Sequence, residues 1–321
     1  MGYLYGVLAN EWIKKKNRIF WILGIYALFA IALMVVEWFS ANTAPTSVSA
    51  VDWHSELEMK LSQLKQYFQT LQTDDPTYRQ ASGQISIMQH QLEMNIQPEP
   101  KGAIHWLNAD ISGVAIKYII PLVIIVIGGD MFSGETSSGT MKLLLLSPMG
   151  RAKLFWTKLI SLFVMSAGLM LFMNVVTFFI GFLRDGAFGF LDPYVVLDAS
   201  AAPFIMESWE FTIMGLFLNM LTIFTVATVV LFFSLLLSIN PSFSVLASFI
   251  FVMIIDSILS IMVKSYPIVH YYPMFHLDML SHFTGNFAGE ASLTTSALLL
   301  LATSLICAAG GLWRMKSKDF A

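Results

Sequence analysis

The chain has 321 residues, of which 56% are hydrophobic and only 12% are charged, and its formal net charge is -3. A soluble domain carries about 25% charged residues, so this composition excludes an ordinary soluble domain. The small negative charge excludes the basic surface of a nucleic-acid-binding protein, and the single cysteine, Cys307, excludes a disulfide framework or a cysteine metal cluster. We expect an all-α, polytopic membrane protein.

Residues 1–18 predict an amphipathic helix, because Leu4, Leu8 and Trp12 recur at helical spacing and a basic cluster follows them. Such a helix would lie in the inner membrane interface, with its basic end near anionic headgroups. An alternative interpretation makes this segment a cytoplasmic extension of the first span. A removable signal peptide is not expected, because the next apolar run is as long as a full span and holds no small-residue cleavage site.

Six segments are apolar over the length of about 20 residues that a helix needs to cross a bilayer. They are Ile19–Phe39, Ile111–Gly129, Leu159–Phe182, Phe211–Leu237, Phe243–Val263 and Leu293–Trp313. Because lipid offers no hydrogen bonds to the backbone, each segment is expected to be a helix. The second is interrupted by Lys117, which would extend toward the interface, and by Pro121, which would kink the helix.

Residues 40–110 form a long and largely polar segment between the first two spans. Two apolar seams run through it at helical spacing. Their members are Leu57, Leu61, Leu64, Phe68 and Leu71 in the first, and Ile85, Met88 and Leu92 in the second. The pattern predicts an extracytoplasmic helical hairpin, which either packs against itself or a second copy or handles substrate outside the membrane.

Basic residues are concentrated beside the span ends that would share a side with the N-terminus. They are Lys14, Lys15, Lys16, Arg18, Lys142, Arg151, Lys153, Lys158, Arg314, Lys316 and Lys318. The positive-inside rule therefore places both termini in the cytoplasm and predicts a multi-pass protein of the cell membrane.

The segment 130–154, between the second and third spans, combines a polar stretch with a short apolar helix. Glu135 lies among serine, threonine and glycine residues, the leucines of Met141–Leu146 follow, and Pro148 would end the helix before the basic Arg151. A short helix held between two spans at the cytoplasmic face would act as a lever for a partner protein.

This segment resembles that of the ABC type-two permeases, the membrane subunits of a class of ATP-binding-cassette exporters. The matching residues are Glu135, Gly139, Thr140, Lys142, the leucine run, Pro148 and Arg151. The resemblance implies that the loop docks on a separate ATPase subunit, with Glu135 near that contact. It also implies that two permease chains, identical or related, enclose one translocation path.

The same residues also have purely structural interpretations. Glu135 would cap the helix that follows, Gly139 would permit a turn, and Lys142 and Arg151 would anchor the chain at the membrane. The chain carries no nucleotide-binding motif, so we expect no enzyme activity and no cofactor here, with ATP and Mg on the partner ATPase. The transported substrate is left open, since residues 40–110 are longer than the corresponding loop of minimal family members.

Polar residues inside the predicted spans form a second candidate site. A carboxylate such as that of Asp256 costs roughly 2.5–3.5 kcal/mol at the bilayer centre, so it should face the bundle interior. Asn174, Asn219 and Thr222 are its expected partners. These groups would either line the translocation path or the dimer interface, or fix helix packing by hydrogen bonds.

Residues 264–290 predict a broken, partly re-entrant segment before the last span. It holds His270, His276, Asp278 and His282, which raise a metal hypothesis although their spacing matches no zinc signature. Two other functions remain as alternatives. The first is a sensor or scaffold whose external hairpin binds a ligand, and the second is a membrane-embedded metal-dependent enzyme that uses these histidines.

Overall fold

A computed structural model of the chain describes residues 2–43, 53–72, 76–98, 102–146, 150–238, 240–262, 266–287 and 291–317. Most of these residues are helical. The α-helices are α1 (Gly2–Thr43), α2 (Trp53–Thr70), α3 (Pro76–Glu93), α4 (Ala103–Asp110), α5 (Ile120–Gly128), α6 (Ser133–Ser137), α7 (Thr140–Leu145), α8 (Arg151–Asp185), α9 (Ser208–Leu236), α10 (Pro241–Phe249), α11 (Ile255–Met262) and α12 (Leu293–Ser317). Two π-helices, η1 (Ala115–Ile119) and η2 (Ile250–Ile254), precede α5 and α11, and strands β1 (Pro193–Leu197) and β2 (Pro203–Glu207) precede α9.

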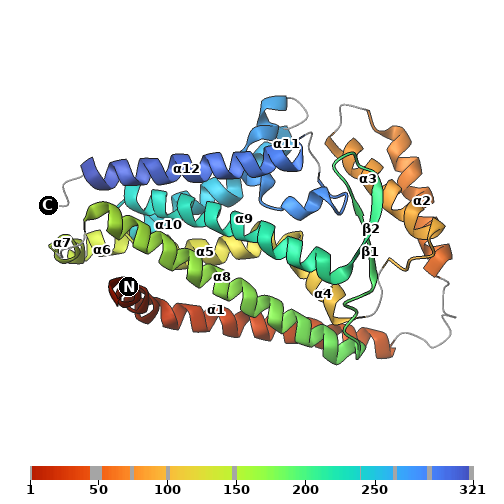
Figure 1. The fold of residues 1–321 in the computed structure, drawn as a ribbon, viewed down its shortest axis with the longest axis horizontal. Helices are drawn as coiled ribbons and strands as arrows, with labels where there is room; N and C mark the ends of the chain where they lie inside the picture. The colour runs from red at the N-terminus through yellow and green to blue at the C-terminus, as the bar shows by residue number, and fades with distance from the viewer. Residues whose placement is uncertain are drawn as a thin grey trace.

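The long helices α1, α8, α9 and α12 run side by side along the long axis of the molecule (Figure 1). The start of α1, the short helices α6 and α7, and the C-terminal end of α12 lie at one end of this bundle, which we call the loop end. Helices α2 and α3 and the two strands lie at the opposite end, which we call the hairpin end.

Five helices among the described residues are long and apolar enough to cross a membrane. They are Ala115–Ser137, Arg151–Asp185, Ser208–Leu236, Pro241–Leu259 and Leu293–Ser317. They coincide with the second to sixth predicted spans and indicate a membrane-embedded protein. The predicted first span, Ile19–Phe39, falls within α1 and stays a prediction.

The interior of the bundle is apolar, and so is much of its outer surface. Leu159 of α8 and Val230 of α9 are fully buried in the core. On the outside, Phe217 is 74% exposed and Leu305 is 69% exposed. Large apolar side chains on both faces are unfavourable in water but suit helices that contact lipid.

The expectation of an all-α fold is wrong at one place, the antiparallel pair β1–β2 at the hairpin end, where Val195 pairs with Ile205. The strands form because Tyr-Val-Val has high β-propensity and lies between Pro193 and a turn at Asp198. The Asp198 carboxylate accepts hydrogen bonds from the amides of Ser200 and Ala202 at 2.8 and 2.9 Å, which closes the turn.

Helix α1 is continuous from Gly2 to Thr43, so it shows no boundary between the predicted interfacial helix and the predicted first span. This continuity matches the alternative interpretation, in which the N-terminal segment extends the first span. Helices α2 and α3 pack against each other, with Leu57 and Leu61 buried and the rings of Phe68 and Tyr78 4.5 Å apart.

The helix of the second predicted span, Ile111–Gly129, begins later than predicted, with the π-helix η1 at Ala115, and continues as α5. Pro121 lacks the amide that would bond to the carbonyl of Lys117, and its ring would clash with that carbonyl in a regular α-helix. The wider π turn relieves this conflict. The described part of segment 264–290 is built from three short 3-10 helices, η3 (Pro267–Tyr271), η4 (Pro273–His276) and η5 (Met279–His282).

Candidate functional site

The loop between the second and third predicted spans forms two short helices, α6 and α7, at the loop end. Gly139 joins them with a φ of 74°, a left-handed conformation that glycine adopts without strain. The predicted helix Met141–Leu146 corresponds to α7, Thr140–Leu145. Pro148, which was expected to end this helix, lies outside the described residues.

Glu135 on α6 faces inward and joins a buried charge network. Only 8% of the residue is exposed. Its two carboxylate oxygens lie 2.8 Å from the Nζ of Lys14 on α1 and 2.8 Å from the Nζ of Lys158 on α8. The Lys158 ammonium, which is fully buried, also donates to Oε1 of Glu11 at 2.9 Å and to the carbonyl of Met131 at 3.2 Å. Glu135 therefore links α6 to α1 and α8.

A second group of charges continues this network along α1. The Asp130 carboxylate, two residues after α5, pairs with Lys15 and accepts from Nη2 of Arg18 at 2.9 Å. Arg18 also donates to the carbonyl of Val126 at 3.2 Å. The three acids Glu11, Asp130 and Glu135 thus meet four basic residues, so the network is close to electrically neutral, as buried charges require.

The remaining residues of the predicted loop pattern lie at the outer surface or on α12. Gly139, Thr140 and Lys142 are exposed at the loop end. Arg151, the first residue of α8, donates to the carbonyls of Met315 and Lys316 at 3.3 and 3.0 Å. Since these are among the last carbonyls of α12, Arg151 caps that helix and fixes the start of α8 against it.

The polar residues of the predicted spans are buried but do not form one cluster. Asp256 pairs with Lys117 of η1, the two charged atoms being 3.5 Å apart. Asn219 and Thr222 are not its partners, because they donate to the backbone carbonyls of Ile111 and Leu277. Asn174 on α8 is also buried, and it lines the same small pocket as Asn219.

The Lys117–Asp256 pair lies at two irregular helical turns. Lys117 belongs to η1, and Asp256 is the second residue after η2. A π turn shifts the helix register by one residue, and such turns are frequent at functional sites. The expectation that Lys117 extends to the interface stays a prediction. Its side chain is 29% exposed, while that of Asp256 is 5% exposed.

Breaking this pair should destabilise the fold. We expect Asp256→Leu to leave the Lys117 ammonium without its partner, and Lys117→Met to leave the Asp256 carboxylate without its partner. The double variant should recover most of the lost stability. A double-mutant cycle on unfolding in mixed micelles should give a coupling energy of about 0.5–3 kcal/mol. Ser257→Ala, on the exposed side of the same helix, is the matched control. A coupling energy near zero would contradict the pairing.

Two of the three histidines before the last span, His276 and His282, contact protein groups, and the backbone carbonyl of His270 contacts the ring of His276. Both His276 Nδ1 and His282 Nε2 lie within hydrogen-bond distance of the hydroxyl of Ser296, at 2.8 and 2.9 Å. Asp278 accepts the amide of Gly113 at 2.9 Å. These contacts tie the segment 266–287 to α12 and to the start of the second predicted span. Within the described ranges, no three metal-ligating side chains come together.

Two parts of the charge network could not be recognised from the sequence. Glu11 and Lys158 are 147 residues apart, and each resembles an ordinary charge beside a membrane. The signal in the sequence was positional: Lys158 lies about two turns inside the long apolar helix α8, deeper than a basic residue at the interface needs to be.

The fold and the site define a polytopic helical protein of the membrane, with a charge network under a short helical loop. Residues 83–321 match the family described as "Protein of unknown function (DUF2705)", and the chain belongs to this family. It is also 25% identical over 189 residues to the "Uncharacterized protein YhcI" of Bacillus subtilis (strain 168). That alignment covers 58% of this chain and 57% of the relative, so the chain spans less than two thirds of that relative's length.

Proposed function

We propose that this chain is the permease subunit of an ATP-binding-cassette exporter, which forms the translocation path with a second permease chain and is driven by a separate ATPase. The observation that carries the proposal is the construction of the loop end. Helix α7 presents Leu143, and Leu146 directly follows its last residue. These leucines are 70% and 82% exposed and lie near the exposed Lys142. An apolar pair flanked by a charge suits a protein partner.

The buried network supports a mechanical role for the same loop. A partner that moves α7 also moves α6, because only Ser138 and Gly139 separate the two helices. Glu135 then transmits the movement to α1 and α8 through Lys14 and Lys158. In this proposal Glu135 couples the loop to the spans from the inside, and the exposed residues of α7 make the contact with the ATPase.

The proposal includes a full topology in the cell membrane. Six helices cross the bilayer, the first of them within α1, and both termini and the α6–α7 loop lie in the cytoplasm. Helices α2 and α3 then form an extracytoplasmic hairpin. The common position of the start of α1, the end of α12 and helices α6 and α7 at the loop end supports this arrangement (Figure 1). Asn174, Asn219 and Asp256 lie on buried faces, where the proposal places the path between spans.

Cysteine labelling tests this topology. In a Cys307→Ser background, an impermeant thiol reagent should label Lys65→Cys in intact cells. Lys153→Cys and Lys316→Cys should react only after permeabilisation. The expectation follows from the basic residues beside the span ends at the loop end. Labelling of position 153 but not of position 65 in intact cells would reverse the orientation and remove the loop end from the cytoplasm.

The function itself is tested by making the exposed face of α7 polar. We expect Leu143→Ser together with Leu146→Ser to abolish recovery of the ATPase subunit with the permease, while membrane insertion stays normal. Leu191→Ser, which changes a leucine of similar exposure at the hairpin end, should have no effect on that recovery.

A further inference from the structure

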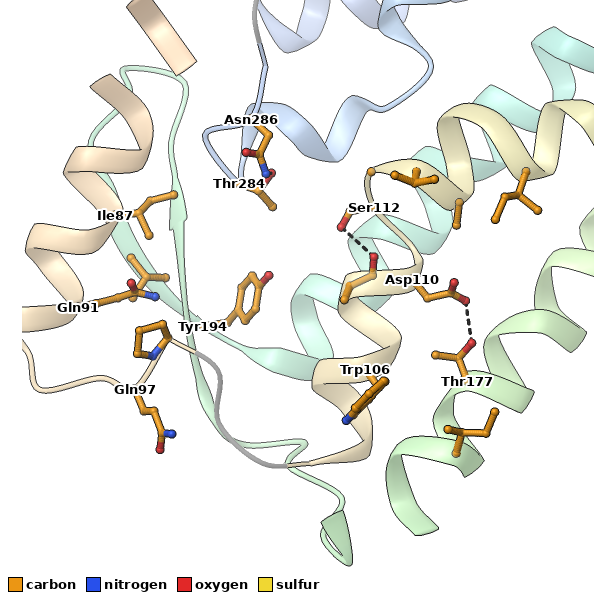
Figure 2. A pocket seen from close by; sticks show the side chains of 18 of the residues that line it. Ile87, Gln91, Gln97, Trp106, Asp110, Ser112, Thr177, Tyr194, Thr284 and Asn286 are labelled. Atoms are coloured by element: carbon orange, nitrogen blue, oxygen red, sulfur yellow. Dashed lines mark hydrogen bonds between the residues drawn. The ribbon is translucent and has the colours of Figure 1, made fainter. Parts of the chain in front are cut away.

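A cavity of about 670 Å³ opens at the hairpin end, in the size range of about 300–1,000 Å³ that is usual for small-molecule sites. Its walls come from parts of the chain that are far apart in sequence: α1, α3, α4, α8, β1 and residues 284–286. Figure 2 shows the polar side chains that face it from these elements. They include Gln91, Trp106, Asp110, Thr177, Tyr194 and Asn286.

Asp110, the last residue of α4, gives the cavity its charge. Among the described residues that line the cavity, it is the one acidic residue, and none is lysine, arginine or histidine. Its Oδ2 accepts hydrogen bonds from the hydroxyls of Thr177 at 3.0 Å and Tyr26 at 3.3 Å. Both donors are neutral. A partly buried carboxylate with neutral donors and no basic residue in the same wall retains the capacity to pair with a cation.

Burial makes a counter-charge beside the Asp110 carboxylate more favourable. Desolvation raises the pKa of the Asp110 carboxyl, against the opposing effect of the hydrogen bonds from Thr177 and Tyr26. The rise means that burial penalises the ionised form of this carboxyl. A ligand cation beside Asp110 would remove that penalty, so binding and ionisation would favour each other.

Two aromatic side chains of the wall are held in place by contacts outside the cavity. The Trp106 indole donates to Asp185 at 2.9 Å and lies under the Arg184 guanidinium, 4.6 Å from the ring centroid. Tyr194 packs on Phe211 with ring centroids 4.5 Å apart, and its hydroxyl points toward the space between α4 and the segment that holds Thr284 and Asn286 (Figure 2).

Two further features fit an organic ligand. Burial raises the pKa of Tyr194 to about 12, so this phenol stays neutral and keeps its proton to donate. Ile87, Ile119 and Ile180 supply apolar surface on three different elements. An inorganic cation would make no favourable contact with these apolar walls. A molecule with an apolar body and one positive group would contact both the apolar side chains and the carboxylate.

We propose that this cavity binds an amphipathic organic cation, with its ammonium or guanidinium group beside Asp110 and its apolar part against Trp106 and the isoleucines. That the bound molecule is the exported substrate rests on the proposed function. The binding itself is a property of this chain and needs no ATPase.

Binding can be measured on the purified chain in phosphatidylcholine nanodiscs. The probe is a fluorescent alkyltrimethylammonium, and an alkylsulfonate with the same chain and fluorophore is its anionic counterpart. Displacement by unlabelled alkyltrimethylammonium separates site binding from partition into lipid. We expect saturable binding of the ammonium probe, and a loss of at least about tenfold in affinity, or 1.4 kcal/mol, in Asp110→Asn.

Matched variants separate the site from general effects on the fold. Asparagine keeps an acceptor for Thr177 and Tyr26, so Asp110→Asn should fold. Glu93→Gln removes an exposed charge that does not line the cavity and should leave affinity unchanged. Ala109→Trp, which changes a small lining residue, should reduce binding by filling the space.

Three results would overturn the proposal: no saturable binding of the ammonium probe, equal binding of the sulfonate probe, or unchanged affinity in both Asp110→Asn and Ala109→Trp. Because no ATPase is present in this assay, these results would not contradict the proposed permease function. Conversely, failure to recover an ATPase subunit with the chain would not contradict the proposed cation site.

Discussion

Replacing Lys158 by methionine should destabilise the protein by about 3–5 kcal/mol, the usual cost of removing one partner from a buried ion pair. Lys158 is fully buried and contacts both Glu11 and Glu135 at 2.9 and 2.8 Å. Without it, two carboxylates remain in a site that admits little water. Lys14 would then compensate only Glu135 at close range, since its Nζ is 3.8 Å from Glu11.

Reversible unfolding in mixed micelles measures this loss. The matched control is Lys142→Met, which removes an exposed lysine at the same end and should change stability by no more than about 0.5 kcal/mol. Combining Lys158→Met with Glu11→Gln and Glu135→Gln should recover much of the loss, because the site then holds neutral groups that can hydrogen-bond. If Lys158→Met unfolds like Lys142→Met, the network does not hold α1, α6 and α8 together.

The sequence predicted those parts of the structure that depend on local pattern. Five apolar segments correspond to helices able to cross a membrane, and the leucines after Gly139 predicted the position of α7. Each of these features is encoded by hydrophobic length, or by glycine and proline at particular places.

Contacts between distant residues were not predictable in the same way. Asp256 was expected to meet amide or hydroxyl groups of neighbouring spans, yet its partner is Lys117, which helix packing brings to it. Similarly, Asp110 appeared only as the last residue of an external segment, and its place in a cavity depends on α1 and α8. Strands β1 and β2 were missed because a five-residue segment with two adjacent valines carries little periodic signal.

The second large effect concerns the exposed face of α7. Leu143→Ser with Leu146→Ser should abolish ATPase recovery, because these two side chains offer the apolar contact area that this face presents. Stability should change little, since both side chains are largely exposed. Substrate-stimulated ATP hydrolysis and transport should fall with recovery. Leu191→Ser should leave all three measurements at the wild-type level.

Glu135 should behave differently from α7 in the same assays. Because it is buried and paired with Lys14 and Lys158, Glu135→Gln should still permit docking of the ATPase. What it should weaken is the response of hydrolysis to substrate, since the movement of α6 would no longer be carried by an ion pair to α1 and α8. The different results expected for the Glu135 and α7 variants distinguish transmission of movement through the loop from docking of the ATPase.

Site-specific photo-crosslinking from position 146 tests the central claim most directly. A photoreactive amino acid placed there in living cells captures whatever contacts the tip of α7, and mass spectrometry identifies the captured protein. The proposed function predicts a cytoplasmic protein with the phosphate-binding glycine motif of ATPases, captured from position 146 and not from position 191. Capture of lipid alone, or of a protein without a nucleotide-binding motif, would contradict the assignment as an exporter permease.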